Sequence, residues 1–134
     1  MSLTVPSDLL AQASQGDVNE DEFVGCIRNS LPYAYGVIEG LSSRLAAGDT
    51  APGVAFADNR TEPPDETSRG QLLRALASDA IRGALERHFG IRLAFQNCHR
   101  VAVFPANGVD EEQYRRFTSV RAQLLNQSPE LVNC

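Results

Sequence analysis

The sequence predicts an α+β fold: a mainly helical single domain over 1–134 with a small antiparallel sheet around residues 91–104. A length of 134 residues fits one domain. Over several segments, apolar residues recur at three- and four-residue steps, the spacing of one helix face. Two short runs near residue 100 instead alternate with period two, as half-buried strands do. An all-α fold, with 91–104 irregular, is the rival interpretation.

Capping signals place the first two helices. Ser7 opens a short helix that Gly16 can close. Asn19 and Glu22 have the form of a capping box, in which each side chain serves a backbone amide of the other. The apolar face of this second helix carries Phe23, Ile27 and Leu31. Pro32 lacks an amide proton, so it must break or kink the helix.

Helical periodicity resumes after Pro32 and ends at Gly48, through the apolar residues Tyr35, Ile38, Leu41 and Leu45. Residues 48–66 form the least regular stretch, punctuated by glycine and proline. Within this loop, 54–57 is a candidate short strand, and we expect 58–66 to be exposed.

The strongest helical signal covers residues 68–89, which we interpret as one central helix. Ser68 and Gln71 can form its capping box, and Gly90 stands where a left-handed terminal residue is expected. Its stripe carries Leu73, Leu76, Ala77, Ala80, Ile81, Ala84, Leu85 and His88. Outside the stripe, Arg82 and Glu86 can pair one turn apart.

Residues 91–95 and 100–104 predict two strands joined by a hairpin loop at 96–99. In this register the residues that face the helices are Ile91, Leu93, Phe95, Val101 and Val103. Because a lone hairpin is marginal in water, it needs a third strand, 54–57, or the edge of a partner chain.

The C-terminal part predicts one further long helix. Asn107 and Gly108 mark a turn, and Asp110 with Gln113 can cap the helix that follows. Its apolar side carries Phe117, Val120, Leu124 and Leu125. Cap, proline and acidic residue then follow in order at Ser128, Pro129 and Glu130, which predicts a terminal helical turn.

Composition excludes several classes of function. All 12 basic residues are arginine, so Schiff-base chemistry and P-loop phosphate binding lack their lysine. Net charge is -5, divided into -8 for residues 1–67 and +3 for residues 68–134. We interpret the two halves as complementary within the fold or across a dimer, because an acidic chain opposes binding to nucleic acid.

Compartment follows from what the sequence lacks. No run approaches the ~20 apolar residues of a membrane-spanning helix, and residues 1–8 show no secretory signal. The three cysteines are widely spaced and odd in number, which suits a reducing compartment. We therefore expect a cytoplasmic protein without cofactor, metal site or membrane partner.

Several stretches resemble a known family: residues 56–59 (FADN) with 64–66 (PDE), 69–76 (RGQLLRAL) and 95–104 (FQNCHRVAVF). Together they are similar to small uncharacterised proteins from Streptomyces and related actinobacteria, over nearly the whole chain. The resemblance implies no activity, cofactor, partner or site residue. It agrees with the lysine-free composition, which is typical of a high-GC genome, and by analogy it points toward natural-product metabolism.

Cys98 and His99 form the most suggestive pair for catalysis, because an imidazole can activate a thiolate nucleophile. Adjacent residues of an extended segment point to opposite faces, so His88 is an alternative partner for Cys98. The structural interpretation is a half-buried loop cysteine beside a helix-terminal histidine, which the helix dipole favours. The spacing of these donors matches no structural zinc pattern.

Three other groups are candidates for binding or catalysis. Tyr33 and Tyr35, with Cys98, are candidates to line a ligand pocket at the Pro32 kink, although core packing is the usual fate of such residues. A basic stripe of Arg115, Arg116 and Arg121 suits an acidic partner or phosphorylated ligand, or else a solvated face. The carboxylates of the irregular loop, Asp58, Asp65 and Glu66, are candidates for acid–base chemistry only if desolvated.

No complete catalytic motif is present, so the first hypothesis is a non-enzymatic interaction or accessory module, regulatory in type, that acts as a homodimer. The second is a small-molecule binding protein linked to natural-product metabolism. The third is a thiol-dependent enzyme that uses Cys98 with His88 or His99. The expected partner is a second copy of the chain, another protein or a small metabolite, rather than nucleic acid.

Overall fold

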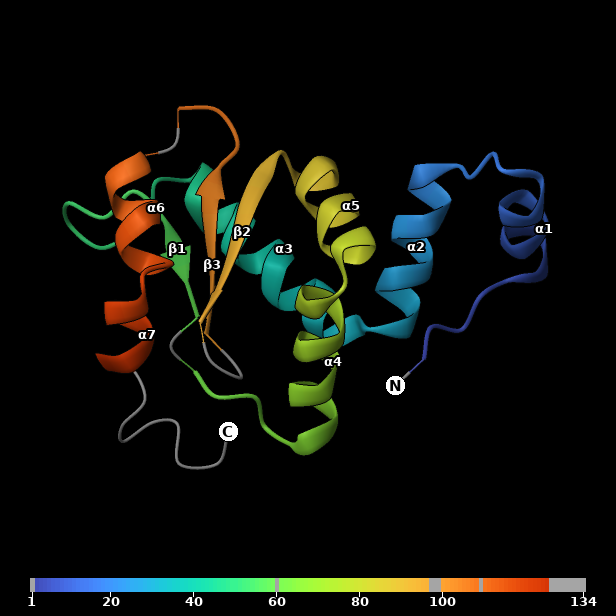
Figure 1. Ribbon diagram of the computed structural model, residues 1–134, viewed down its shortest axis with the longest axis horizontal. Coiled ribbons are helices and arrows are strands. Elements are labelled where there is room, and N and C mark those ends of the chain that lie inside the picture. The colour runs from blue at the N-terminus through green and yellow to red at the C-terminus, as the bar shows by residue number, and fades with distance from the viewer. Residues whose placement is uncertain (1, 60, 97–99, 109, 126–134) are drawn as a thin grey trace.

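The computed structural model describes residues 2–59, 61–96, 100–108 and 110–125, and within them it confirms the α+β class (Figure 1). The elements in chain order are α1 (Ser7–Gln15), α2 (Glu20–Ser30), α3 (Pro32–Ala46), β1 (Ala57–Asp58), α4 (Glu66–Ala77), α5 (Asp79–Phe89), β2 (Ile91–Gln96), β3 (Arg100–Pro105), α6 (Glu111–Phe117) and α7 (Val120–Leu125). No helix in the described ranges has the length and apolar character needed to cross a bilayer.

The sheet is antiparallel with the strand order β1-β3-β2, so the predicted hairpin is confirmed and β3 is its central strand. The third strand is β1 at Ala57–Asp58, at the end of the segment expected to form it. Asn59 lengthens this short pairing, because its Oδ1 accepts from the amide of Val101 at 2.7 Å. Its own amide donates to the Val101 carbonyl at 3.2 Å.

Both faces of the sheet are buried. The residues predicted to face the helices do so: Ile91, Leu93, Val101 and Val103 pack in one core with α2 to α5, and Phe95 lies against it. A second cluster covers the opposite face, where Ala94, Ala102 and Phe104 meet Phe117 of α6, with Phe56 and Tyr114 alongside. Figure 1 shows α6 on one side of the sheet and α3 and α5 on the other.

The predicted helix over 68–89 is wrong in its continuity and its start. Ser78 is extended (φ -96°, ψ 117°) and its Oγ accepts from the amide of Ile81, so it ends α4 and caps α5. Helix α4 begins at Glu66, where Asp65, not Ser68, is the cap and accepts from the Ser68 amide at 2.7 Å. That hydrogen bond holds the pKa of Asp65 below its ordinary value. Gly90 closes α5 at φ 65°, as predicted.

The expected pair of Arg82 with Glu86 does not form. Arg82 donates to the carboxylate of Asp79 at 2.5 Å and to the carbonyl of Leu76 at 2.9 Å, so it binds both sides of the α4–α5 break. Glu86 accepts from the amide of Leu93 at 2.9 Å. Since β2 is an edge strand, Glu86 thereby covers an edge amide that the sheet leaves unpaired.

The last helix is also divided. Asp110 caps α6 by accepting from the Gln113 amide, as predicted, but the helix ends at Phe117. Helix α7 follows after Thr118 and Ser119, and the Ser119 Oγ accepts from the amide of Ala122 at 3.0 Å. Of the predicted apolar side only Phe117 is buried. The turn predicted at 128–130 lies outside the described residues.

Near the N-terminus, Gly16 closes α1 at φ 80° and Asn19 caps α2 by accepting from the Glu22 amide, as predicted. The reciprocal half of the predicted capping box is replaced by Gln12. Its Oε1 accepts from the Asn19 amide at 2.9 Å, and its amide group donates to the Glu22 carboxylate. Gln12 therefore ties α1 to the start of α2.

The predicted break at Pro32 is confirmed, and the first turn of α3 is capped from another helix. Pro32 is the first residue of α3. The Gln71 side chain of α4 accepts from the amides of Tyr33 at 2.7 Å and Ala34 at 3.3 Å. Because Leu31 has no side-chain oxygen, Gln71 supplies the cap that the local sequence lacks.

Replacing Gln71 with alanine tests this tertiary cap. Gln71 is 8% exposed, and the change removes the acceptor of the Tyr33 and Ala34 amides. We therefore expect the free energy of unfolding to fall by about 1–3 kcal/mol. Urea unfolding followed by far-UV circular dichroism measures it. The control Gln15→Ala, at the exposed end of α1, should change stability by less than about 0.5 kcal/mol; equal losses in both variants would contradict the assignment.

Candidate functional site

The predicted thiol site is only partly described. Cys98 and His99 lie outside the described residues, so the dyad of Cys98 with His88 or His99 stays a hypothesis. His88 is exposed in the last turn of α5, where its Nε2 lies 3.4 Å from the hydroxyl of Tyr35. The structure therefore brings together two of the sequence-predicted candidates, His88 and Tyr35.

The two tyrosines at the Pro32 break have different surroundings. Tyr35 is buried, and its ring lies 5.4 Å from that of Phe89 between centroids. Tyr33 is half-buried, and desolvation, with a smaller contribution from the Asp65 carboxylate, raises the pKa of its hydroxyl. Tyr35 thus fills core space, and the role of Tyr33 and Tyr35 in ligand binding stays a prediction.

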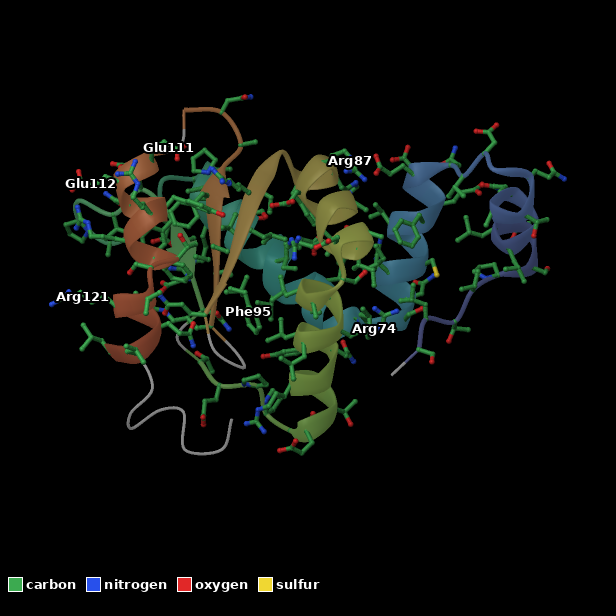
Figure 2. All side chains as sticks on the ribbon, in the orientation of Figure 1. Arg74, Arg87, Phe95, Glu111, Glu112 and Arg121 are labelled. Atoms are coloured by element: carbon green, nitrogen blue, oxygen red, sulfur yellow. The ribbon has the colours of Figure 1, made fainter. Side chains whose placement is uncertain are left out.

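The predicted basic stripe is exposed and divided between two helices. Arg115 and Arg116 end α6, and Arg121 lies on α7. Arg116 pairs with Glu112 at 2.9 Å. Figure 2 shows Arg121 pointing away from the sheet. From Gln113 to Leu125 the chain carries these three arginines and no carboxylate.

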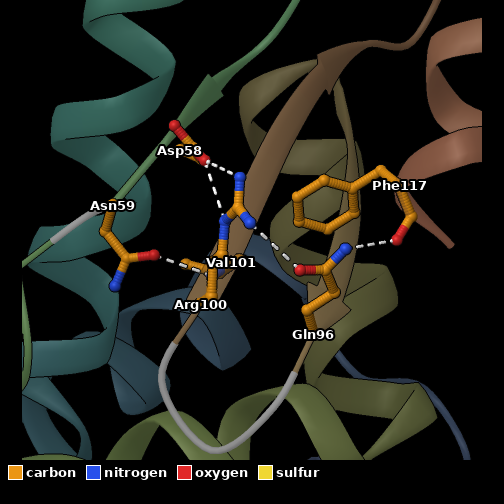
Figure 3. A network of polar contacts seen from close by, with 6 residues as sticks. All are labelled: Asp58, Asn59, Gln96, Arg100, Val101 and Phe117. Carbon is orange, nitrogen blue, oxygen red and sulfur yellow. Dashed lines mark hydrogen bonds and ion pairs between the residues drawn. The ribbon is translucent and has the colours of Figure 1, made fainter. Parts of the chain in front are cut away.

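A polar network joins the ends of the three strands (Figure 3). Arg100 donates through Nε and Nη2 to the Asp58 carboxylate at 3.0 and 2.8 Å, and through Nη1 to Gln96 at 3.2 Å. Gln96 donates in turn to the carbonyl of Phe117 at 2.6 Å, and the Arg100 guanidinium lies 5.2 Å from the Phe117 ring centroid. The expectation that Asp58 is exposed is wrong: it is 13% exposed, and Arg100 is 19% exposed.

A cavity of about 330 Å³ adjoins this network between the sheet and α6. Its lining includes Phe56, Gln96, Arg100, Gln113, Arg116 and Phe117. The Gln113 side chain also holds the loop at residues 53–55 against α6, since it accepts from the amide of Ala55 and donates to the carbonyl of Gly53. The lining mixes aromatic rings with cations, although Arg100 and Arg116 each already hold a carboxylate.

A second cavity, of about 340 Å³, lies between α1 and α2, and each residue that lines it is apolar. We call it the α1–α2 groove; its lining is Val5, Leu9, Leu10, Ala13, Val18, Phe23 and Cys26. Leu9 and Cys26 are buried, whereas Val5, Leu10 and Val18 are 44%, 59% and 44% exposed. Figure 1 places α1 at one end of the molecule, beyond α2. Residues 1–27 carry five carboxylates and no arginine, so this end is acidic.

An apolar surface on α7 lies at the opposite end (Figure 1). We call it the α7 face; it consists of Val120, Leu124 and Leu125, which are 77%, 67% and 62% exposed. Large side chains so exposed on one short helix are unlike the scattered apolar residues of an ordinary surface. The four-residue spacing of Val120 and Leu124 predicts the apolar side of a helix, and the structure leaves that side exposed.

Metal binding finds no support in the part of the chain that the structure describes, where no three His, Cys, Asp or Glu side chains lie close enough to hold an ion. Asp65 and Glu66 begin α4, so their position has a structural cause. Sequence reasoning did not find the α1–α2 groove. The signal available to it was the spacing of Val5, Leu9 and Ala13, four residues apart.

The network predicts that Asp58 and Arg100 stabilise the fold as a pair. Asp58→Ala leaves a largely buried guanidinium without its carboxylate, and we expect a loss of about 2–3 kcal/mol in unfolding free energy. The double variant Asp58→Ala, Arg100→Met should lose less than the sum of the single variants Asp58→Ala and Arg100→Met, by about 1 kcal/mol or more. Glu112→Ala, which breaks the exposed pair with Arg116, is the control, expected at about 0.5 kcal/mol. Strict additivity would refute the pair.

Comparison with known proteins gives one match. A family model described as NucS shadow ORF, whose label carries the prefix KH, matches residues 1–134. No curated protein matches the chain, and neither does any solved structure. Because the model covers the whole chain, the protein belongs to the NucS shadow ORF family.

Proposed function

We propose that the chain is a non-enzymatic interaction module that acts as a homodimer. The observation that carries the proposal is the pair of exposed apolar surfaces, the α1–α2 groove and the α7 face, at opposite ends of one small domain. Monomeric soluble proteins rarely expose contiguous apolar patches of this kind, because burying them against a partner is favourable. The three residues of the α7 face lie outside the two core clusters, and of the groove lining only Phe23 packs against one of them.

The polar interior supports a binding role over a catalytic one. The largely buried ion pair, Arg100 with Asp58, uses its groups on each other and on Gln96. The lowered pKa of Asp65 has a sufficient cause in its helix cap. We therefore assign these groups to the fold, and the thiol hypothesis remains that of Cys98 with His88 or His99.

A nucleic-acid partner is less well supported than a protein partner. KH domains hold a nucleic-acid backbone with a Gly-x-x-Gly loop. No two glycines of this chain are three positions apart, and α4 and α5 meet at the single residue Ser78. The net charge of -5 also opposes binding to phosphates.

The proposed setting is the reducing cytosol of an actinobacterium. The sequence uses arginine in place of lysine throughout, and Cys26 is a free, buried thiol. A reducing compartment keeps such a thiol intact. This proposed location does not depend on whether the chain forms a dimer.

Size-exclusion chromatography with light scattering tests the proposed function. We expect a mass of twice 14.6 kDa at high protein concentration and dissociation on dilution, as mass action requires. Capture from a cell lysate extends the test to other partners. A chain that stays at the monomer mass at every concentration and captures no protein would refute the proposal.

A small-molecule role is the second candidate, and the cavity beside Arg100 favours it. Its volume of about 330 Å³ lies within the usual range for ligand sites. Arg100, Arg116 and two phenylalanine rings suit a small aromatic anion. Thermal-shift screening with aromatic carboxylates and phosphates should raise the melting temperature, and Arg116→Ala should abolish the rise. No stabilisation across the panel would remove this candidate.

A further inference from the structure

We propose that the α7 face of one copy occupies the α1–α2 groove of a second copy, and that a twofold axis relates the copies so that both contacts form. This inference rests on the proposed function, since it names the surfaces through which the homodimer assembles. The two surfaces match in kind: one is a concave apolar groove of about 340 Å³, the other a short helix with three exposed aliphatic side chains. A helix in an apolar groove is a recurrent mode of recognition, anchored at positions four residues apart.

Charge selects this pairing over the alternatives. Three exposed carboxylates, Asp8, Asp17 and Asp21, lie within one or two residues of groove positions in the sequence, in a segment that has no arginine. On the other side, Arg121 follows Val120 on α7 and Arg115 lies in the last turn of α6, in a segment that has no carboxylate. Two grooves brought together would place carboxylates opposite carboxylates, and two α7 faces would place arginines opposite arginines. Only the contact between groove and α7 face is complementary.

The positions of the surfaces allow a closed dimer. Helix α1, which forms one wall of the groove, and helix α7 lie toward opposite ends of the longest axis of the molecule (Figure 1). In the proposed dimer, two copies lie side by side in antiparallel orientation, so that each α7 reaches the groove of the other and the same contact forms twice. Such an arrangement satisfies twofold symmetry, whereas an end-to-end contact would continue into an open chain.

Dimerisation through the sheet is the competing geometry, and Glu86 opposes it. The strand β2 is the longer of the two edge strands. Pairing with the β2 of a second copy would require the backbone amides of β2 that point away from the sheet. The carboxylate of Glu86 already accepts from one of these, the amide of Leu93. A second strand would have to displace this hydrogen bond in both copies.

A complementation experiment on the full chain tests the proposal. Leu10→Asp places a charge in the groove, and Leu124→Arg places the opposite charge on the α7 face; Leu10 and Leu124 are both exposed, so the fold is retained. Each variant alone should raise the dimer dissociation constant about tenfold or more. An equimolar mixture should recover most of the affinity, because the mixed dimer holds one wild-type contact and one Asp–Arg contact. Leu73→Asp, on α4 and 41% exposed, is the matched control and should leave the constant unchanged.

The outcomes separate this inference from the proposed function. A wild-type chain that is monomeric at every concentration overturns both. A wild-type dimer that withstands both substitutions, or yields to only one of them, overturns the pairing of groove and α7 face while the homodimer stands. A mixture no tighter than either variant alone also overturns it. Assemblies that grow beyond two copies overturn the twofold arrangement, and circular dichroism spectra that match the wild type establish that each variant is folded.

Discussion

The rest of the structure depends on removing one strand, β3, from water. Its residues 101–104 are fully buried on both faces. Buried amides and carbonyls need partners, so β3 must be paired along both edges, by β2 on one side and by β1 with the side chain of Asn59 on the other. Its side chains need two covering layers, which α3, α4 and α5 supply on one face and α6 with Phe56 on the other. At its first residue, Arg100 requires the carboxylate of Asp58 because both side chains lie mostly beneath the surface.

Local signals in the sequence were sufficient for most of the elements. The hairpin, its inward face, the break at Pro32 and the caps at Asn19 and Asp110 follow from alternation, from a missing amide proton and from short polar side chains. Features that depend on contacts between distant residues could not be predicted from such local signals. The predicted stripe is wrong in α4, where Leu73 and Ala77 are exposed and Leu72, Ala75 and Leu76 face the core instead. Apolar residues at the exposed positions continue the spacing of α5 across Ser78, so the sequence looks like one helix although the buried face changes at the break. Serine followed by aspartate at 78–79 was the only local mark of that break.

The candidate sites were harder to predict because they depend on what is left uncovered. Val120, Leu124 and Leu125 have the spacing of a core face, and sequence alone does not reveal that α7 extends beyond the sheet that α6 covers. The sequence predicts a solvated loop residue at Asp58 because its partner, Arg100, lies 42 positions away in the chain. The division of charge between the two halves was visible in the sequence. The structure adds that the acidic segment carries the α1–α2 groove and that the basic segment carries the α7 face.

The cap that Gln71 provides for α3 has a consequence for the order of assembly during synthesis. Gln71 follows Tyr33 by 38 positions, so at ordinary elongation rates the ribosome adds it roughly two to eight seconds later. During that interval the amides of Tyr33 and Ala34 have only water as an acceptor, and Pro32 prevents α2 from continuing across the gap. The first turn of α3 therefore gains its side-chain cap only after α4 has been synthesised, from a residue in the second half of the chain.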